Sequence, residues 1–166
     1  MGAAKKSFTL LQDAVRLAGF DFRRSTPQER QEDIDLVIWP VGFPQKAAAL
    51  TLKNTLLKKS KKRKHLWGWV ELQTKEGRPG WLYKKFTYVA YERKGDFALI
   101  HKKDLRNWIE KENLARWDLP FVKNSWGASY RLFRRKDTKE AIFQIKVKDA
   151  LVNCRHLIWN KDERNS

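Results

Sequence analysis

The chain has 166 residues, and its 36 Lys and Arg against 19 Asp and Glu give a formal net charge of +17 at pH 7. A charge of this size calls for a polyanionic partner, and DNA and RNA are the commonest such partners. Hydrophobic residues make up 42% of the chain, including 8 Trp and 9 Phe, which excludes a disordered basic tail and predicts a single folded domain over residues 1–166.

Cysteine content and the lack of long apolar runs bound the cellular setting. Cys154 is the only cysteine, so no intramolecular disulfide and no cysteine-rich zinc site can form. We therefore expect a reducing, cytoplasmic setting in contact with DNA. The first residues lead straight into an amphipathic segment, and no segment approaches the about 20 apolar residues of a membrane helix, so we expect neither a secretory signal nor a membrane partner.

The first predicted element is a helix over residues 7–19. Apolar residues recur at helical spacing from Phe8 to Ala18, and Gly19 stands where a helix often ends. The Ser-Thr-Pro-Gln-Glu segment at 25–29 then combines a capping residue, an early proline and an acid, which is the order expected at the start of a helix.

The middle of the chain predicts strands, because apolar and aromatic residues gather there in short runs bounded by turn residues. Pro40 ends the first of these strands, and Gly95 marks a turn between the last two. A helix follows from Leu105 to Glu112. The predicted strands cover residues 34–39, 49–54, 66–74, 87–92 and 97–101.

Beyond Pro120, residues 129–134 and 141–147 predict a C-terminal β-hairpin around Asp137-Thr138. Arginines decorate this hairpin, and a two-stranded ribbon can enter the major groove of DNA. The nucleic-acid-binding candidates of the hairpin are Arg131, Arg134 and Arg135.

Two acids stand at the start of the first predicted strand. If the segment is extended, Asp33 and Asp35 point to the same face, because strand side chains alternate. Mg²⁺ favours one or two carboxylates together with phosphate oxygens, so the pair is a candidate metal site. Taken alone, these acids also fit the simpler interpretation of exposed residues at a strand start.

The next predicted strand carries Thr51 and Lys53 on one face, so Lys53 is expected to project beside Asp35. A lysine there can orient the attacking water and stabilise charge on a phosphate during hydrolysis. The third strand carries Glu71 within an apolar run, and a glutamate is rarely buried without a partner. A metal ion shared with Asp35 would supply that partner, as would an Arg or Lys; Gln73 lies on the same face.

Together these elements resemble the PD-(D/E)XK nuclease superfamily, most closely its small phage and homing-type members. The resemblance covers roughly residues 8–113 and rests on the order of the helix, Ile34-Asp35, Thr51-Leu52-Lys53, Glu71 and the segments 77–81 and 86–91. In that family an Asp at one strand start and an acid-x-Lys on the next build a Mg²⁺ site for phosphodiester hydrolysis. The resemblance implies a restriction-endonuclease-like α/β (α+β) core, with a mixed central β-sheet flanked by helices and the C-terminal hairpin as an extension over residues 114–160.

One position departs from the family. Thr51, a poor metal ligand, stands where the second acid is expected, so on this alignment the site borrows Glu71 from the neighbouring strand. A second alignment takes Glu71-Leu72-Gln73 as the motif, since some restriction enzymes of the superfamily have Gln in place of Lys. Both alignments make Asp35 and Glu71 the metal ligands, and they differ over Lys53 against Gln73 as the additional catalytic residue.

A dense basic run lies between the two candidate catalytic strands, and phosphate contact is its natural use. A localisation signal or a loop ordered only by a ligand would give the same pattern. The basic residues of the run are Lys58, Lys59, Lys61, Lys62, Arg63 and Lys64.

The resemblance therefore predicts a Mg²⁺-dependent endodeoxyribonuclease, with Mn²⁺ as a substitute, that acts on duplex DNA in preference to single strands. Site-specific cleavage of the homing or restriction type and structure-specific cleavage both stay open. Because one such domain cuts one strand, cutting both strands implies a homodimer or larger homo-oligomer. The alternative is a lapsed nuclease or another basic domain that binds DNA or RNA without catalysis, and Thr51 at the expected acidic position is the reason to consider a lapsed nuclease. Charge alone does not separate DNA from RNA.

Overall fold

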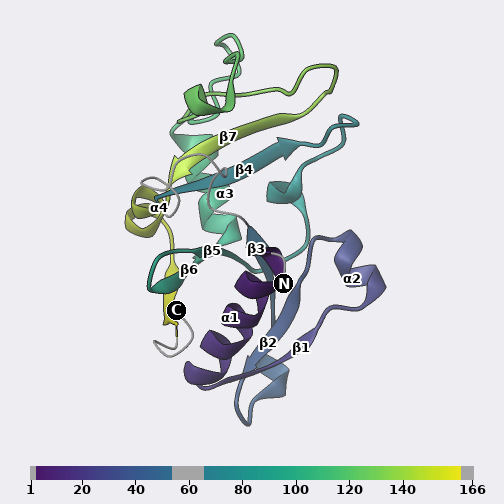
Figure 1. Cartoon of the computed structure of the whole chain (residues 1–166), viewed down its shortest axis with the longest axis vertical. Coiled ribbons are helices and arrows are strands. Elements are labelled where there is room, and N and C mark those ends of the chain that lie inside the picture. The colour runs from purple at the N-terminus through teal and green to yellow at the C-terminus, as the bar shows by residue number, and fades with distance from the viewer. Residues whose placement is uncertain (1–2, 54–65, 162–166) are drawn as a thin grey trace.

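The computed structural model describes residues 3–53 and 66–161, which form a mixed α/β fold (Figure 1). A curled six-stranded sheet has the strand order β1-β2-β3-β5-β6-β8, and β4 and β7 form a separate two-stranded ribbon. The strands are β1 (Phe20–Arg24), β2 (Leu36–Pro40), β3 (Ala48–Lys53), β4 (Trp67–Gln73), β5 (Tyr88–Glu92), β6 (Asp96–His101), β7 (Ala141–Lys146) and β8 (His156–Asn160). The helices are α1 (Ala3–Leu17), α2 (Pro27–Gln31), α3 (Lys102–Lys111) and α4 (Val147–Asn153), with short 3-10 turns η1 (Pro44–Lys46), η2 (Trp81–Tyr83) and η3 (Ser125–Gly127).

The two predicted helix signals near the N-terminus are confirmed. Helix α1 is followed by Gly19 at a φ of 78°, a left-handed conformation that glycine adopts without the steric penalty of a side chain. Thr26 caps α2 by accepting a hydrogen bond from the Glu29 N–H, and the Glu29 carboxylate accepts one from the Thr26 N–H. Glu29 also pairs with Arg23, which ties α2 to β1.

Alternating side chains on the large sheet divide the core into two layers. On β6, Phe97 and Leu99 join a cluster with Leu11 and Val15 of α1, whereas the opposite face packs against the β4–β7 ribbon and helices α3 and α4. Figure 1 shows the ribbon on the side of the sheet away from α1. Strands β2 and β3 pair antiparallel, and β5 and β6 form a hairpin around Gly95, where the sequence predicts a turn.

The predicted C-terminal hairpin is wrong. Strand β7 pairs along its length with β4, while Ser129 and Phe133 make only isolated bridges to it. Tyr130 has a φ of 52°, which interrupts an extended strand in its segment. The pairing with β4 is favoured because both strands direct apolar residues into one core, among them Val70 and Phe143. The expectation that β4 is the sheet neighbour of β3 is therefore wrong, because β3 lies between β2 and β5.

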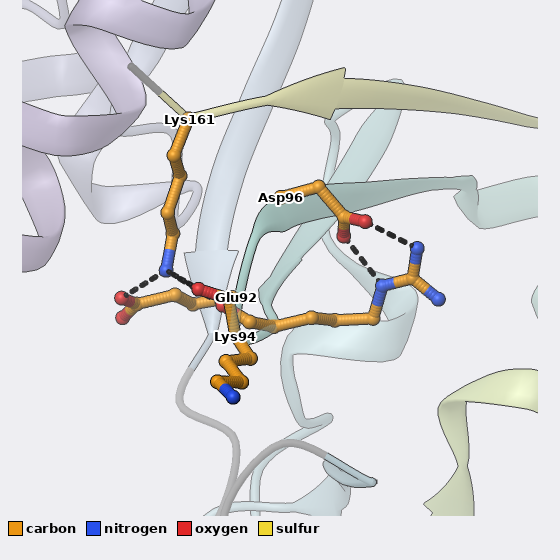
Figure 2. A network of polar contacts seen from close by, with 5 residues as sticks. Glu92, Lys94, Asp96 and Lys161 are labelled. Atoms are coloured by element: carbon orange, nitrogen blue, oxygen red, sulfur yellow. Dashed lines mark hydrogen bonds and ion pairs between the residues drawn. The ribbon is translucent and has the colours of Figure 1, made fainter. Parts of the chain in front are cut away.

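A polar network fastens the end of β8 to the β5–β6 turn (Figure 2). The Nζ of Lys161 lies 2.8 Å from Oε1 of Glu92 and donates to the carbonyl of Arg93 at 2.6 Å. The other oxygen of Glu92 accepts a hydrogen bond from Ser7 on α1 at 2.6 Å. Glu92 thus links α1, the central hairpin and the last described residue. Across the described ranges, no helix is long and apolar enough to cross a membrane.

Candidate functional site

A pocket lies where the β4–β7 ribbon meets the end of β3. Its volume is about 360 Å³, at the small end of the range for ligand sites. Charged and aromatic side chains share its wall, and they come from segments far apart in the chain. The lining residues are Lys53, Trp69, Glu71, Trp81, Ser125, Phe133, Arg135, Glu140 and Ile142.

Lys53 stands at the pocket and pairs with Asp33, with 3.1 Å between Nζ and Oδ1. Asp33 has a φ of 60°, so the segment before β2 is not extended there and the two aspartates do not follow strand alternation. The expectation that Lys53 projects beside Asp35 is wrong, because the salt-bridge partner of Lys53 is Asp33. The ammonium of Lys53 also lies 5.8 Å from the ring centroid of Trp81.

Asp35 lies beside Thr51, the residue at the expected second acidic position. Its Oδ2 accepts hydrogen bonds from the Leu52 N–H at 2.7 Å and from the Thr51 hydroxyl at 3.2 Å. The Asp35 N–H donates to the Leu50 carbonyl at 2.9 Å, so Asp35 helps to join β2 to β3. Thr51 is fully buried, and its hydroxyl points at the carboxylate.

Glu71 projects from β4 into the pocket, where its Oε2 accepts a hydrogen bond from the backbone N–H of Trp81 at 3.2 Å. Burial raises the pKa of its carboxyl above the ordinary value, and the negative charges of Asp33 and Glu140 act in the same direction. The Trp81 hydrogen bond and the charge of Lys53 oppose this rise in pKa. Glu71 is therefore a half-buried acid whose negative charge is incompletely compensated by its surroundings.

Gln73, the alternative to Lys53 in the motif, serves the turn after β4. Its Nε2 donates to the Gly77 carbonyl at 2.9 Å, and the residue does not line the pocket. The geometry therefore places Lys53 at the pocket and Gln73 outside its wall.

Gly80 holds η2 against β4 and so sets the position of Trp81. A Cβ at Gly80 would lie 2.4 Å from the Glu71 carbonyl oxygen. We expect Gly80→Ala to lower the free energy of unfolding by about 1–3 kcal/mol, because the backbone has to move away from β4, and to disrupt the Trp81–Glu71 hydrogen bond. Thermal unfolding of Gly80→Ala and Gly95→Ala tests this, since a Cβ at Gly95 meets open space. Equal losses in the two variants would contradict it.

Glu140 is a site residue that was not predicted from the sequence. Its side chain is buried, with 4% of the residue exposed, and its Oε2 lies 3.2 Å from Nε of Arg135. The signal that was present is the one used for Glu71, an acid adjoining an apolar run, here Ala141 to Ile145. The predicted hairpin paired this segment with residues 129–134 and not with β4, so Glu140 was not expected near Glu71.

The two turns at one end of the β4–β7 ribbon form a basic tip. The Lys139 N–H donates to the Lys75 carbonyl at 2.9 Å, which holds the two turns together, and both project from the same end of the ribbon (Figure 1). Arg135 belongs to the tip and also lines the pocket, so the two features are continuous. The exposed cations of the basic tip are Lys75, Arg78, Arg134, Arg135, Lys136 and Lys139.

Two of the predicted phosphate-binding arginines, Arg131 and the tip residue Arg134, also contact other parts of the protein. Arg131 is half-buried and donates to the Pro120 carbonyl at 3.3 Å. Arg134 donates to the Glu140 carbonyl and lies over the Phe121 ring, 4.2 Å from its centroid. The basic run at 58–64 lies outside the described residues.

Comparison with known proteins does not assign this site. The chain matches no protein-family model, no curated protein and no solved structure. Within residues 3–53 and 66–161, no group of three or more His, Cys, Asp or Glu side chains is arranged to hold a metal ion. A divalent ion at this pocket would therefore depend on at most two of the described carboxylates.

Proposed function

We propose that this protein is a nuclease that binds nucleic acid at the basic tip and hydrolyses phosphodiester bonds at the adjoining pocket. The observation that carries the proposal is a pocket that is lined by Glu71 and Lys53 and opens beside a dense array of exposed cations, with Asp33 paired to Lys53. Phosphates attracted by the tip are brought against a half-buried acid and a lysine. Lysine beside the scissile phosphate stabilises developing negative charge, and an acid there holds a cation or accepts a proton.

The carboxylates in and beside the pocket are the type of ligand that a divalent cation prefers. Mg²⁺ favours carboxylate oxygens, keeps part of its water shell and accepts phosphate oxygens as further ligands, so two carboxylates suffice. Glu71 and Asp33 are the acids facing Lys53, and Asp35 stays a predicted ligand although its Oδ2 already accepts two hydrogen bonds. When bound, the ion would polarise the phosphate and lower the pKa of a bound water. Lys53 would hold the attacked phosphate, and Trp81 would orient Glu71 through its N–H.

A second candidate is nucleic-acid binding without hydrolysis. The observation in its favour is Thr51, whose hydroxyl replaces a second carboxylate and donates to Asp35. In this case the basic tip alone accounts for the affinity, and the pocket acids serve recognition.

The experiment that separates these functions measures cleavage and binding in the same preparation. We expect hydrolysis of plasmid, linear duplex or branched DNA with Mg²⁺ or Mn²⁺ and none with EDTA. In EDTA, binding of duplex DNA should weaken with salt at a logarithmic slope of about −5 if each cation of the basic tip neutralises one phosphate. Intact substrates with salt-sensitive binding would establish the second candidate, and the absence of both would contradict both functions.

A further inference from the structure

We infer that the aromatic part of the pocket binds one unstacked nucleobase, with guanine as the preferred base. The inference rests on the proposed nucleic-acid partner and adds to it what the pocket recognises. It is carried by the aromatic side chains of Trp69 and Phe133, which line the pocket, and by the Arg135–Glu140 pair, which hydrolysis does not require.

The pocket offers aromatic surface for stacking. Trp69, Trp81 and Phe133 all line it, and Ile142 adds apolar surface. Trp81 is already packed against Phe86 and the Lys53 ammonium. In the part of the chain that the structure describes, no aromatic ring or cation stacks on Trp69 or Phe133. Stacking of a base on such rings is the general means by which proteins hold single-stranded nucleic acid.

The polar groups at the same wall match one base edge. Glu140 is 4% exposed, and among the described residues its Oε2 receives no hydrogen bond although Arg135 Nε lies 3.2 Å away. A buried carboxylate oxygen with unused acceptor capacity calls for N–H donors. Guanine presents an oxygen acceptor next to two N–H donor positions on its pairing edge, which complements an arginine donor next to a carboxylate. Thymine and uracil present a single N–H donor there.

The basic tip beside the pocket favours a nucleotide base over a cationic ligand such as a methylated lysine. Aromatic walls with acids also suit a cation, but Lys53 and Arg135 at the same pocket oppose one. A nucleotide carries its base together with a phosphate, and the basic tip beside the pocket attracts the phosphate. A base becomes available to such a pocket in a single strand or when it is flipped from a duplex.

The test uses a short strand of abasic sugar-phosphate that carries one guanine, compared with the same strand without a base. Binding is measured by fluorescence anisotropy in EDTA, so it is independent of hydrolysis. We expect the guanine strand to bind at least about fivefold more tightly, and thymine in its place to lose most of that gain. Equal affinity of the guanine and abasic strands overturns the inference, as does tighter binding of a trimethyl-lysine peptide than of guanosine monophosphate.

Variants then locate the base. Trp69→Ala should remove the guanine advantage, and Glu140→Gln should reduce the preference for guanine over thymine, whereas exposed Trp117→Ala is the matched control that should change neither. An undiminished guanine advantage in folded Trp69→Ala places the base elsewhere and overturns the inference. If the protein shows no Mg²⁺-dependent cleavage but keeps the guanine advantage, the proposed hydrolysis is contradicted and the base-binding inference is not. Failure of every strand to bind at low salt contradicts the nucleic-acid partner itself.

Discussion

Replacing Glu71 by Gln should lower Mg²⁺-dependent cleavage at least about 100-fold while duplex binding in EDTA stays within about twofold. The size of the loss is that of removing one electrostatic stabiliser from an active site. Glutamine retains an oxygen for the Trp81 N–H, which donates to Glu71 at 3.2 Å, so the pocket keeps its shape. Initial cleavage rates and anisotropy titrations measure the two quantities separately.

The same substitution should not destabilise the protein at neutral pH. Burial raises the folded-state pKa of Glu71 above 4.5, so the folded state binds the proton more tightly than the unfolded state does. The resulting stabilisation is present below the unfolded pKa and is lost as pH rises through the folded pKa. The stability of Glu71→Gln relative to the natural chain should therefore increase as pH rises above about 4.5. Denaturant unfolding at a series of pH values checks this sign.

Glu110→Gln on α3 is the matched control for both measurements. Glu110 is exposed and pairs with Arg106 at 2.7 Å on the outer surface of the helix. Cleavage by this variant should stay within about twofold of the natural chain, because an exposed ion pair contributes little. Full cleavage by Glu71→Gln would exclude Glu71 as a catalytic carboxylate. A large loss of stability would instead assign Glu71 a structural role.

Replacing Lys161 by Met should lower the free energy of unfolding by about 3 kcal/mol. The Lys161 side chain is 6% exposed, and its Nζ lies 2.8 Å from Glu92 in the network of Figure 2. Met fills a similar volume but donates no hydrogen bond, so Glu92 and the Arg93 carbonyl lose a buried donor. For a domain of this size, the melting temperature should fall by about 6–12 °C.

Lys94→Met is the control for Lys161, because Lys94 belongs to the same turn but its side chain is exposed and points away from the network (Figure 2). We expect a change within about 0.5 kcal/mol for it. A double-mutant cycle of Lys161→Met with Glu92→Gln isolates the ion pair, and its coupling energy should reach about 1–3 kcal/mol. Equal melting temperatures for the two lysine variants would show that the network does not hold β8.

Local signals predicted elements whose causes are local. Gly19 after the first helix and the Thr26–Glu29 capping box mark boundaries through backbone conformation and hydrogen bonds within a few residues. The hairpin around Gly95 was predicted for the same reason, since it joins adjacent apolar runs. Strands β1 and β8 and helix α4 were not predicted. Arg23 and Arg24 interrupt the apolar pattern of β1, and four of the five β8 residues are exposed in the fold.

The candidate site was predictable only in part. The unusual settings of Asp35 and Glu71 were visible in the sequence, as was the alternation that brings Lys53 to one face of its strand. The partner of Lys53 was wrong because Asp33 adopts a left-handed φ, which strand periodicity does not anticipate. The contribution of Glu140 was missed because the segment before β7 was assigned to a local hairpin.

The sequence by itself determined the net positive charge, the mixed α/β composition of elements, the capped start of α2 and the turns at Gly19 and Gly95, because each depends on composition or on neighbours in the chain. Only the tertiary structure decided that β7 pairs with β4, since that choice depends on which apolar faces share a core. The same pairing brings Arg135 and Glu140 to the pocket of Glu71 and joins two separate basic turns into one tip. Basic residues that are spread along the chain are thereby gathered on a surface beside Glu71 and Glu140, and the proposed chemistry depends on that proximity.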